Sequence, residues 1–433
     1  MKLFKTNHLN DTEKKTFSLH LIYSMLEGIV LGVLALNEFV FLKSLHGSHM
    51  QLGILFQFSM LVFIGLIFIN ELIRRTKNKV RMLKRTALFT RLPLVLLAFF
   101  PQTASGILEQ PYFHFIFLFI FLIYYLASPI IYPTINQFLK NTYRHENFGK
   151  LYSQATSVNK IVMLAVTFAY GIWLDINPFA FTIIYPFIAL TGILSVYILS
   201  KIPYTEKDII IKKPFFLSIK ESMIGMKNLI TTNKPYLHFE IGFMFYGFAF
   251  MSSVAVITIY YYDVLNLNYS SVAFYKNAYN ILAIILLPFF GKLLGRIDPR
   301  KFAAITFASM MLYIGALTIT QFFPQFIDIL NIRIYYWMLV YIFFHGIFAA
   351  TMSLLWFIGS AYFGKDEDAG ALQSVHLSLT GIRAAFAPII GILFYEWFGF
   401  TITFVIAMGS LLLAILLMIW SYRNEEVIKS RTE

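Results

Sequence analysis

Long apolar runs follow one another along almost the whole of this chain, and they restrict what it can fold into. A helix needs roughly 20 apolar residues to cross the hydrocarbon core of a bilayer, which is about 30 Å thick. By that rule the sequence predicts an all-α polytopic membrane protein with twelve transmembrane helices. The expected helices cover residues 17–42, 48–72, 86–106, 113–136, 150–174, 178–202, 236–262, 269–292, 302–323, 334–361, 372–396 and 399–421.

The composition excludes several other classes of protein. Hydrophobic residues make up 58% of the chain and charged residues 13%, whereas a soluble domain carries about 25% charged residues. The absence of cysteine excludes disulfides and thiolate metal sites, and we predict neither a metal nor a cofactor. Because the apolar run after Met1–Lys15 is too long for a signal peptide, we expect it to remain as the first membrane helix.

The basic residues set the expected orientation in the membrane. Of the 35 Lys and Arg residues, 29 fall in connections on the side of the two termini, and only Lys43 and Arg333 fall in connections on the other side. Because cytoplasmic connections are rich in Lys and Arg, both termini are expected to be cytoplasmic. The net charge of +13 then fits acidic lipid headgroups, and nucleic acid is not expected as a partner. We predict an integral protein of a bacterial inner membrane or a plasma membrane.

The chain also repeats itself at an offset of 221 residues. The aligned pairs are Leu72 with Leu293, Arg75 with Arg296, Lys79 with Arg300, Gly149 with Gly370 and Ser153 with Ser374. One offset that satisfies two separate loops indicates a duplicated bundle whose halves have the same orientation, an architecture of secondary transporters. We therefore expect an N-terminal six-helix bundle over residues 1–202, a cytoplasmic linker over 203–235 and a C-terminal six-helix bundle over 236–433.

The linker is expected to contain an amphipathic helix. Apolar residues recur there at steps of three and four residues, with Lys and Glu side chains between them. This spacing predicts a helix with one apolar stripe, which would lie along the membrane surface or against the bundle. A solvated linker without such a helix is the alternative. The residues of the expected stripe are Phe216, Ile219, Met223, Met226 and Ile230.

Two connections carry degenerate copies of the pattern G-x-x-x-D-R-x-G-R-K. Residues 291–301 read GKLLGRIDPRK, which keeps the opening glycine and an arginine but has Gly295 in place of the aspartate. Residues 70–79 read NELIRRTKNK and depart further from the pattern. Through these loops and the six-plus-six arrangement over nearly its full length, the chain resembles the major facilitator superfamily of secondary transporters.

The resemblance implies a role for the two loops. In that superfamily they latch the cytoplasmic side through an aspartate–arginine charge relay. Because the aspartate is missing from both copies, the arginines are expected to pair with helix C-terminal carbonyls or with other acids. The residues assigned to this cytoplasmic gate are Arg75, Lys79, Arg296, Asp298 and Arg300.

Four ionisable side chains are expected near the middle of the membrane. Glu27, Lys160, Arg383 and His345 each lie about ten residues inside a predicted helix, or roughly 15 Å at 1.5 Å per residue. An ionisable group at that depth normally faces the bundle interior and marks function. Glu27 is assigned to ion coupling, and the other three to substrate binding. The structural alternatives are that Glu27 pairs with Lys160 or Arg383, and that His345 is a hydrogen-bonded structural group.

Four further polar residues receive lesser assignments. Asn277 and Asn280 occupy the outer half of the eighth predicted helix and join the substrate-binding set. Arg91 is expected to reach the inner membrane surface, and Glu240 is expected at the interface near the start of the seventh helix.

The leading hypothesis is a secondary active transporter that works by alternating access on a small solute. The sequence has no nucleotide-binding signature, so an ion gradient, expected to be protons, or solute exchange must supply the energy. The excess of cations over acids at midplane favours an anionic or carboxylate-bearing solute. A proton-coupled efflux pump for lipophilic or cationic drugs is the alternative.

We do not expect an enzyme. A receptor or scaffold of the same fold is a further alternative, and the expected partners of a monomeric carrier are solute, coupling proton and membrane lipids.

Overall fold

The computed structural model describes residues 9–204, 213–364 and 369–432, and its internal contacts divide the chain into two compact units. One unit comprises Met1–Gly47 and Phe68–Phe215, and the other comprises Ser48–Ile67 and Phe216–Glu433. Within the described ranges, nine helices are long and apolar enough to cross a membrane, and one bent pair of helices makes a tenth. The prediction of an all-α polytopic membrane protein is confirmed.

The two remaining predicted spans are helical but do not form separate long helices. The run predicted at 86–106 is split into α5 (Lys79–Arg91) and a 3-10 helix, η1 (Leu92–Phe99), at Pro93, which lacks the backbone N–H that an α-helix needs. The last two runs are joined into α16 (Ala369–Ala384) and α17 (Ala387–Thr432), which are interrupted before Pro388 and at Gly399. Each of the twelve predicted runs therefore has a helical counterpart.

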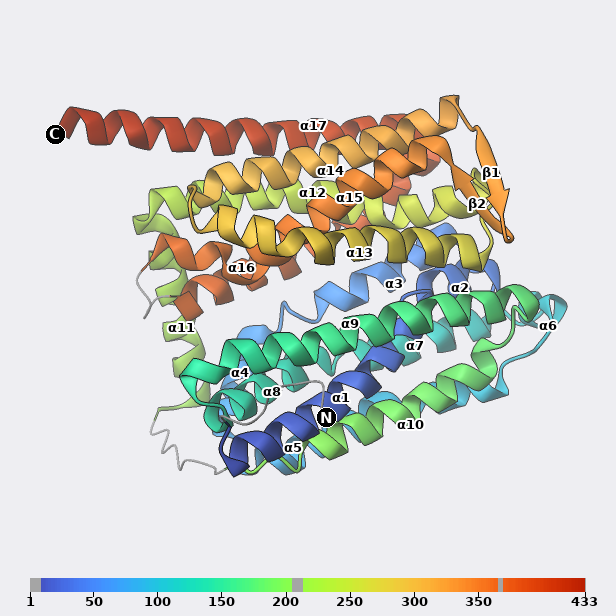
Figure 1. Ribbon diagram of the computed structural model, residues 1–433, viewed down its shortest axis with the longest axis horizontal. Helices are drawn as coiled ribbons and strands as arrows, with labels where there is room; N and C mark the ends of the chain where they lie inside the picture. The colour runs from blue at the N-terminus through green and yellow to red at the C-terminus, as the bar shows by residue number, and fades with distance from the viewer. Residues whose placement is uncertain (1–8, 205–212, 365–368, 433) are drawn as a thin grey trace. The chain divides into compact units, whose positions relative to one another are not determined.

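The first unit is organised around α1 (Asp11–Leu34), which packs against α9 (His145–Ile176) and α10 (Phe181–Leu199). Asn10 and Glu13 form a capping box that fixes the start of α1. Figure 1 shows α1, α9 and α10 running alongside one another. The remaining helices of this unit are α2 (Asn37–Lys43), most of α4 (Leu66–Arg75), α5, η1, α6 (Ala104–Leu108), α7 (Tyr112–Tyr125) and α8 (Ser128–Thr142).

The second unit repeats this packing. Its first long helix, α12 (Lys234–Asp263), packs against α16 and α17, as α1 packs against α9 and α10. Around these helices α14 packs against both α15 and α17, and α13 packs against α15 (Figure 1). The remaining elements of this unit are α3 (His49–Leu61), α11 (Phe215–Thr232), α13 (Tyr269–Leu294), α14 (Pro299–Phe322), β1 (Phe326–Ile329), β2 (Ile332–Tyr335), α15 (Tyr336–Leu354), the π-helical η2 (Leu355–Gly359) and η3 (Ser360–Phe363).

Two features of the second unit were not predicted. The run expected at 48–72 is bent by 43° between α3 and α4, and α3 packs with α16 and α17. A β-hairpin joins α14 to α15, with Phe326 opposite Tyr335 and a turn in which Leu330 and Asn331 both have positive φ. Two successive positive φ values match the tight turns that suit hairpin twist.

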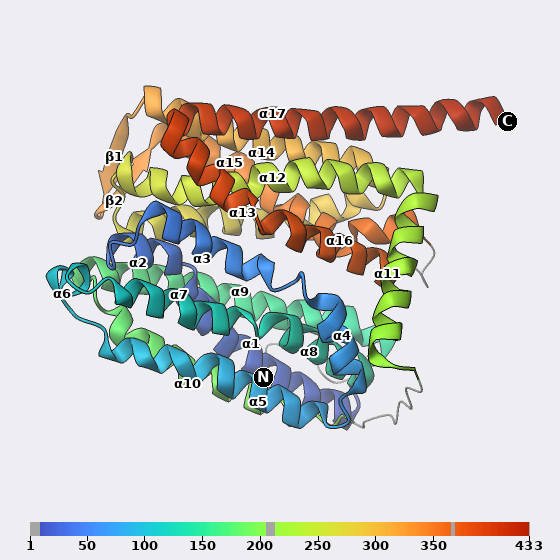
Figure 2. The same cartoon turned by 180° about the vertical axis from the view of Figure 1, so that it is seen from behind.

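The helix α11 occupies most of the linker, and it runs crosswise to α12 (Figure 2). It buries Ser218 and Ile219, whereas Phe216 and Met223 are exposed. The expected apolar stripe therefore lies on one face of the helix but is buried only at Ile219 and partly at Met226 and Ile230. The domain ranges 1–202 and 236–433 stay a prediction.

Candidate functional site

A buried ion pair lies inside the first unit, where α1, α5 and α10 meet. Glu27 and Arg91 are each 4% exposed, and Arg91 Nη1 lies 2.6 Å from Glu27 Oε1. The same nitrogen donates to the carbonyl of Gly192 and, at 3.1 Å, to the hydroxyl of Ser195. The Ser195 hydroxyl in turn donates to Glu27 Oε1. The charges of this cluster cancel within hydrogen-bond distance.

The local backbone makes room for this arginine. Gly192 and Ser195 lie one turn apart on α10, so both face the guanidinium. A Cβ at Gly192 would come within 2.6 Å of Arg91 Nη1 and 3.0 Å of its Cδ, so a larger residue would displace the side chain. Glycine at this position is therefore part of the pair's geometry.

The expectation that Arg91 reaches the inner membrane surface was wrong. Its helix starts at Lys79, not near residue 86, so Arg91 lies twelve residues inside α5, or roughly 18 Å along it. At that depth a charged side chain must find a partner inside the protein. Within this unit Glu27 accordingly pairs with Arg91 and not with Lys160.

Lys160 lies on α9 of the same unit and is half-buried. No ion pair joins it to an acid among the described residues of that unit. The neighbouring Asn159 donates to the carbonyl of Ser24 over 2.9 Å, which ties α9 to α1 beside it. The assignment of Lys160 to substrate binding stays a prediction.

The second unit buries an arginine in a different environment. Arg383, on α16, is 1% exposed and donates to the Phe243 carbonyl at 2.5 Å and the Thr380 hydroxyl at 3.1 Å. Its guanidinium carbon lies 5.8 Å from the ring centre of Tyr246 and 6.0 Å from that of Trp356. Its Nε is buried without a hydrogen-bond partner, and no described carboxylate lies within ion-pair distance.

A buried acid–histidine pair joins α12 to α16, the helix that carries Arg383. His376 Nδ1 is 3.1 Å from Glu240 Oε1 and 3.2 Å from Oε2, and the two side chains are 1% and 2% exposed. Sequence reasoning missed His376 and placed Glu240 at the interface. A signal was present: His376 and Arg383, like Glu240 and Gly247, lie seven residues apart, which puts each pair on one face of its helix.

His345 lies in an aromatic cluster of the second unit. Its ring is stacked on Tyr279 at 3.7 Å and on Tyr313 at 4.4 Å between ring centres. The Tyr341 hydroxyl lies 2.7 Å from His345 Nδ1, and the Tyr261 hydroxyl donates to Tyr341 at 2.8 Å. These contacts hold the imidazole in place, which agrees with the structural alternative, and the assignment of His345 to substrate binding stays a prediction.

The two asparagines assigned to substrate binding lie on α13, and both are half-buried. Asn280 donates to the Lys276 carbonyl of its own helix at 2.7 Å. The structure thus places Arg383, His345, Asn277 and Asn280 in one unit and Glu27 and Lys160 in the other.

In the gate loop of the first unit, the arginines pair with Glu71, which lies about one helical turn before position 74, where the pattern has aspartate. Glu71 Oε1 accepts from Arg75 Nε at 2.7 Å, and Glu71 Oε2 lies 2.7 Å from Arg74. Arg75 also donates to the Lys213 carbonyl at 2.7 Å. Lys79 is buried at the start of α5. Arg75 therefore pairs with an acid, which was one of the expected alternatives, and with a main-chain carbonyl that lies just before α11 and not at a helix C-terminus.

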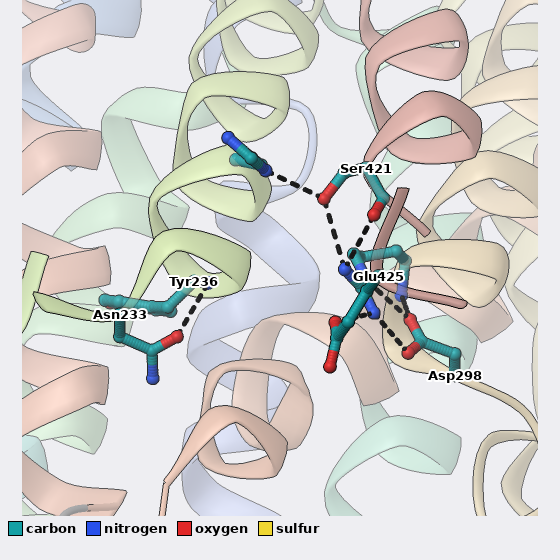
Figure 3. Close-up of polar contacts among 7 residues, drawn as sticks. Asn233, Tyr236, Asp298, Ser421 and Glu425 are labelled. Atoms are coloured by element: carbon teal, nitrogen blue, oxygen red, sulfur yellow. Dashed lines mark hydrogen bonds and ion pairs between the residues drawn. The ribbon is translucent and has the colours of Figure 1, made fainter. Parts of the chain in front are cut away.

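In the corresponding loop of the second unit, the arginine pairs with Asp298, which lies three residues after Gly295, the residue that replaces the aspartate of the pattern. Arg300 Nη2 lies 2.8 Å from Asp298 Oδ2 and 2.6 Å from Glu425 Oε2. Figure 3 labels these two acids together with Ser421. Ser421 accepts from Arg300 Nη1 through its carbonyl at 3.1 Å and its hydroxyl at 3.2 Å. Arg296, by contrast, is exposed. Arg300, not Arg296, therefore holds α14 to α17.

The contact with Arg300 changes the pKa of the Asp298 carboxyl. Burial alone raises the pKa of its carboxyl, but the hydrogen bonds and charge of Arg300 lower it by more, so the net pKa lies below the ordinary value. Asp298 also caps α14 by accepting from the Arg300 backbone N–H at 2.8 Å.

An all-α membrane protein whose two parallel repeats each bury ionisable groups has the characteristics of a secondary transporter. The family model of the Major Facilitator Superfamily matches residues 16–330 and 278–433, and the chain belongs to this superfamily. No curated protein sequence matches the chain significantly.

Solved structures of the same fold include transporters of different solutes. A structure of the nucleoside transporter NupG has a TM-score of 0.68 at 11% identity, covering 95% of this chain and 100% of that one. A structure of the peptide transporter POT with sulfate has a TM-score of 0.67 at 13% identity, covering 95% and 94%. A POT family transporter in complex with 5-aminolevulinic acid has a TM-score of 0.67 at 10% identity, covering 94% and 96%.

Proposed function

We propose that this transporter carries a small solute with a carboxylate group, and that Arg383 binds that carboxylate. The observation that supports this is the buried guanidinium of Arg383, which has two hydrogen-bond acceptors and no carboxylate partner among the described residues. A carboxylate-bearing solute would supply the missing negative charge.

The physical argument rests on the cost of a buried charge. A guanidinium cannot lose its proton inside a protein, so it must stay charged. Removing an ion from water costs several kcal/mol unless an opposite charge and further hydrogen bonds compensate it. The aromatic faces of Tyr246 and Trp356 compensate only a part, since a cation–π contact contributes about 0.5–2 kcal/mol. A carboxylate that accepts two parallel hydrogen bonds from the guanidinium compensates more.

The fold relatives agree with this class of solute but do not define it. 5-Aminolevulinic acid, bound in one POT family structure, carries a carboxylate, and so do unmodified peptides at their C-terminus. Nucleosides, the solutes of NupG, carry none. These solutes therefore form a natural test set for the proposed specificity.

The alternative is proton-coupled efflux of lipophilic or cationic drugs. The buried acids Glu27 and Glu240 favour it, because a cationic solute needs a carboxylate. Both acids, however, already have a nitrogen partner at 2.6 Å or 3.1 Å. Arg383 has no such partner, which favours the anionic solute.

The test is uptake into proteoliposomes of 5-aminolevulinic acid, alanyl-alanine and uridine, with and without an inward proton gradient. We expect uptake of at least one carboxylate solute, stimulation by the gradient, and no uptake of uridine. Arg383→Gln should abolish uptake and remove the thermal shift that the solute causes. Arg423→Gln, which changes an exposed arginine of the same unit with no assigned role, serves as the matched control. Undiminished solute binding by Arg383→Gln, or uptake of uridine alone, would reject the proposal.

We further propose that the protein works as a monomer in a bacterial inner membrane or plasma membrane, with both termini cytoplasmic. The Lys and Arg distribution supports this orientation. Because the chain has no cysteine, single cysteines introduced near Thr232 and Leu330 can be labelled separately. A membrane-impermeant thiol reagent should label only the second from outside intact cells, and the opposite pattern would reverse the assignment.

A further inference from the structure

The buried Glu240–His376 pair has no part in the proposed binding of the carboxylate, yet it lies beside the arginine that would bind it. Phe243 contacts both groups: its carbonyl accepts from Arg383, and its ring packs edge-on against His376 at 4.7 Å. Trp356 also lies against both, 5.0 Å from the His376 ring and 6.0 Å from the guanidinium. The two groups thus share their neighbours.

The register of α12 and α16 explains this proximity. Glu240 contacts His376, and seven residues further along both helices Gly247 contacts Arg383. The two helices therefore run parallel, and the pair and the arginine lie two turns apart, or about 10 Å along the helix. A Cβ at Gly247 would overlap the guanidinium, so glycine allows Arg383 to lie against α12.

The contacts of the two ring nitrogens of His376 differ. Nδ1 faces both carboxylate oxygens of Glu240, and because an ionised carboxylate can only accept, Nδ1 carries the donated proton when Glu240 is ionised. Nε2 is buried and has no hydrogen-bond partner. A neutral imidazole leaves a free lone pair on Nε2, which is the position where a second proton can bind.

Few other titratable groups face this histidine. From α12 they are Glu240 and Tyr236, whose hydroxyl donates to the Leu372 carbonyl at 2.7 Å. From α16 itself Arg383 lies two turns away, and Thr380 donates to the His376 carbonyl at 3.0 Å. The π-helical η2 contributes Trp356, which does not titrate. Among the described residues, Glu240 and Arg383 are therefore the charges that control His376.

We propose that His376 and Glu240 form a proton-binding site whose occupancy controls anion binding at Arg383. With neutral His376, the charges of Glu240 and Arg383 sum to zero across the cluster. When a proton from water binds to Nε2, the imidazolium pairs with Glu240, and the charge of Arg383 is left uncompensated. A carboxylate that then binds Arg383 returns the cluster to zero. Proton and carboxylate therefore favour each other's binding, as linkage requires.

The distance sets the size of this effect. Two unit charges about 10 Å apart at an effective dielectric constant of about 20 interact strongly enough to change an equilibrium roughly tenfold. Protonation of His376 should therefore raise carboxylate affinity about tenfold, and carboxylate binding should move the titration midpoint of His376 up by about one pH unit. The coupling to the carboxylate rests on the proposed function, whereas the proton site itself does not.

The test is a ¹⁵N NMR titration of the full-length protein labelled at histidine, in lipid nanodiscs between about pH 5 and pH 9. His376→Gln identifies the signal, and His376→Asn replaces it if the first variant is not monodisperse. We expect this signal to titrate. Arg383→Gln should move its midpoint up by about one pH unit, because a nearby positive charge is removed. Glu240→Gln should move it down by at least as much. Arg383→Met provides a second neutral variant.

Controls separate this proposal from the transport function. Arg423→Gln, at an exposed position with no assigned role, should leave the His376 midpoint unchanged. A His376 signal that does not titrate in the wild type, or a midpoint that is unmoved in both Arg383 variants, overturns the proton site whatever the solute is. Addition of 5-aminolevulinic acid should raise the midpoint in the wild type but not in Arg383→Gln. If the proton site titrates as expected but no carboxylate solute binds, the proposed function fails and the proton site stands.

Discussion

Each unit of this transporter buries an arginine against a glycine, and these two arginines, Arg91 and Arg383, are held in similar ways. Arg91 lies against Gly192, and Arg383 lies against Gly247, where a larger side chain would collide with the guanidinium. Each donates to a main-chain carbonyl of a neighbouring helix. The difference is the next partner: Arg91 meets the carboxylate of Glu27, whereas Arg383 meets aromatic rings and a hydroxyl.

This difference distinguishes Arg91, whose charge is neutralised by a carboxylate of the protein, from Arg383, which we propose binds the carboxylate of a solute. A buried pair that is closed by its own carboxylate gains little from a ligand, and breaking it leaves a buried charge without a partner. A buried cation without a carboxylate has the opposite property, because a negative ligand removes an existing cost. The same residue type can therefore hold helices together in one half of a duplicated protein and bind solute in the other.

The largest expected effect comes from removing each arginine in turn. Arg91→Met leaves Glu27 buried and unpaired, so it should lower the free energy of unfolding by about 3–5 kcal/mol. Arg383→Met removes a charge that has no carboxylate partner, so it should cost less than about 1 kcal/mol in the absence of solute. Thermal unfolding of the purified variants in one detergent measures both. Equal losses in the two variants would break the comparison.

Two additional variants determine the role of Glu27. The double variant Glu27→Met with Arg91→Met removes both charges and should recover most of the stability that Arg91→Met loses. Glu27→Gln should also be destabilised if the pair is structural. If Glu27 is instead the coupling acid, Glu27→Gln should stay stable, abolish proton-driven uptake and leave solute exchange intact. Unchanged pH dependence of uptake in Glu27→Gln would contradict the coupling role.

The next largest expected effect is the loss of stability when Gly192 or Gly247 is replaced. Alanine at Gly192 or Gly247 forces a methyl group into the space of a guanidinium, and such overpacking should cost about 1–3 kcal/mol. Gly247→Ala should also weaken carboxylate binding, because it displaces Arg383, whereas Gly192→Ala should leave binding unchanged. Gly225→Ala, on an exposed part of α11 with nothing within 4 Å of the new Cβ, is the matched control and should not destabilise. Loss of solute affinity in Gly192→Ala would show that the first arginine is not purely structural.

The sequence predicted the helices and the family far better than it predicted the charge partners. Apolar runs are local patterns, and each predicted run has a helical counterpart among the described residues, nine or ten of them long and apolar enough to cross a membrane. Glu27 and Arg91 are 64 residues apart, and Glu240 and His376 are 136 apart, so their pairing depends on how helices pack. Arg91 was placed at the wrong depth because a hydropathy pattern does not show where a basic helix such as α5 begins. Depth and partner have to be known together before a membrane charge can be assigned a role.

The smallest expected effect concerns the pair of Arg300 with Asp298, in which the arginine is buried but the acid is partly exposed, at 4% and 24%. The depressed pKa of Asp298 means that its ionised form stabilises the folded state above its unfolded pKa of about 3.9, and that this stabilisation is lost as the pH falls through the lower folded value. Asp298→Asn keeps a capping side chain on α14 but removes the charge, so it should cost less than about 1 kcal/mol at neutral pH. The difference between wild type and variant should shrink in acid, which thermal unfolding at several pH values measures. A loss as large as that of Arg91→Met would show that partial exposure of the acid does not weaken the pair, and the distinction between this pair and the fully buried Glu27–Arg91 pair would need to be redrawn.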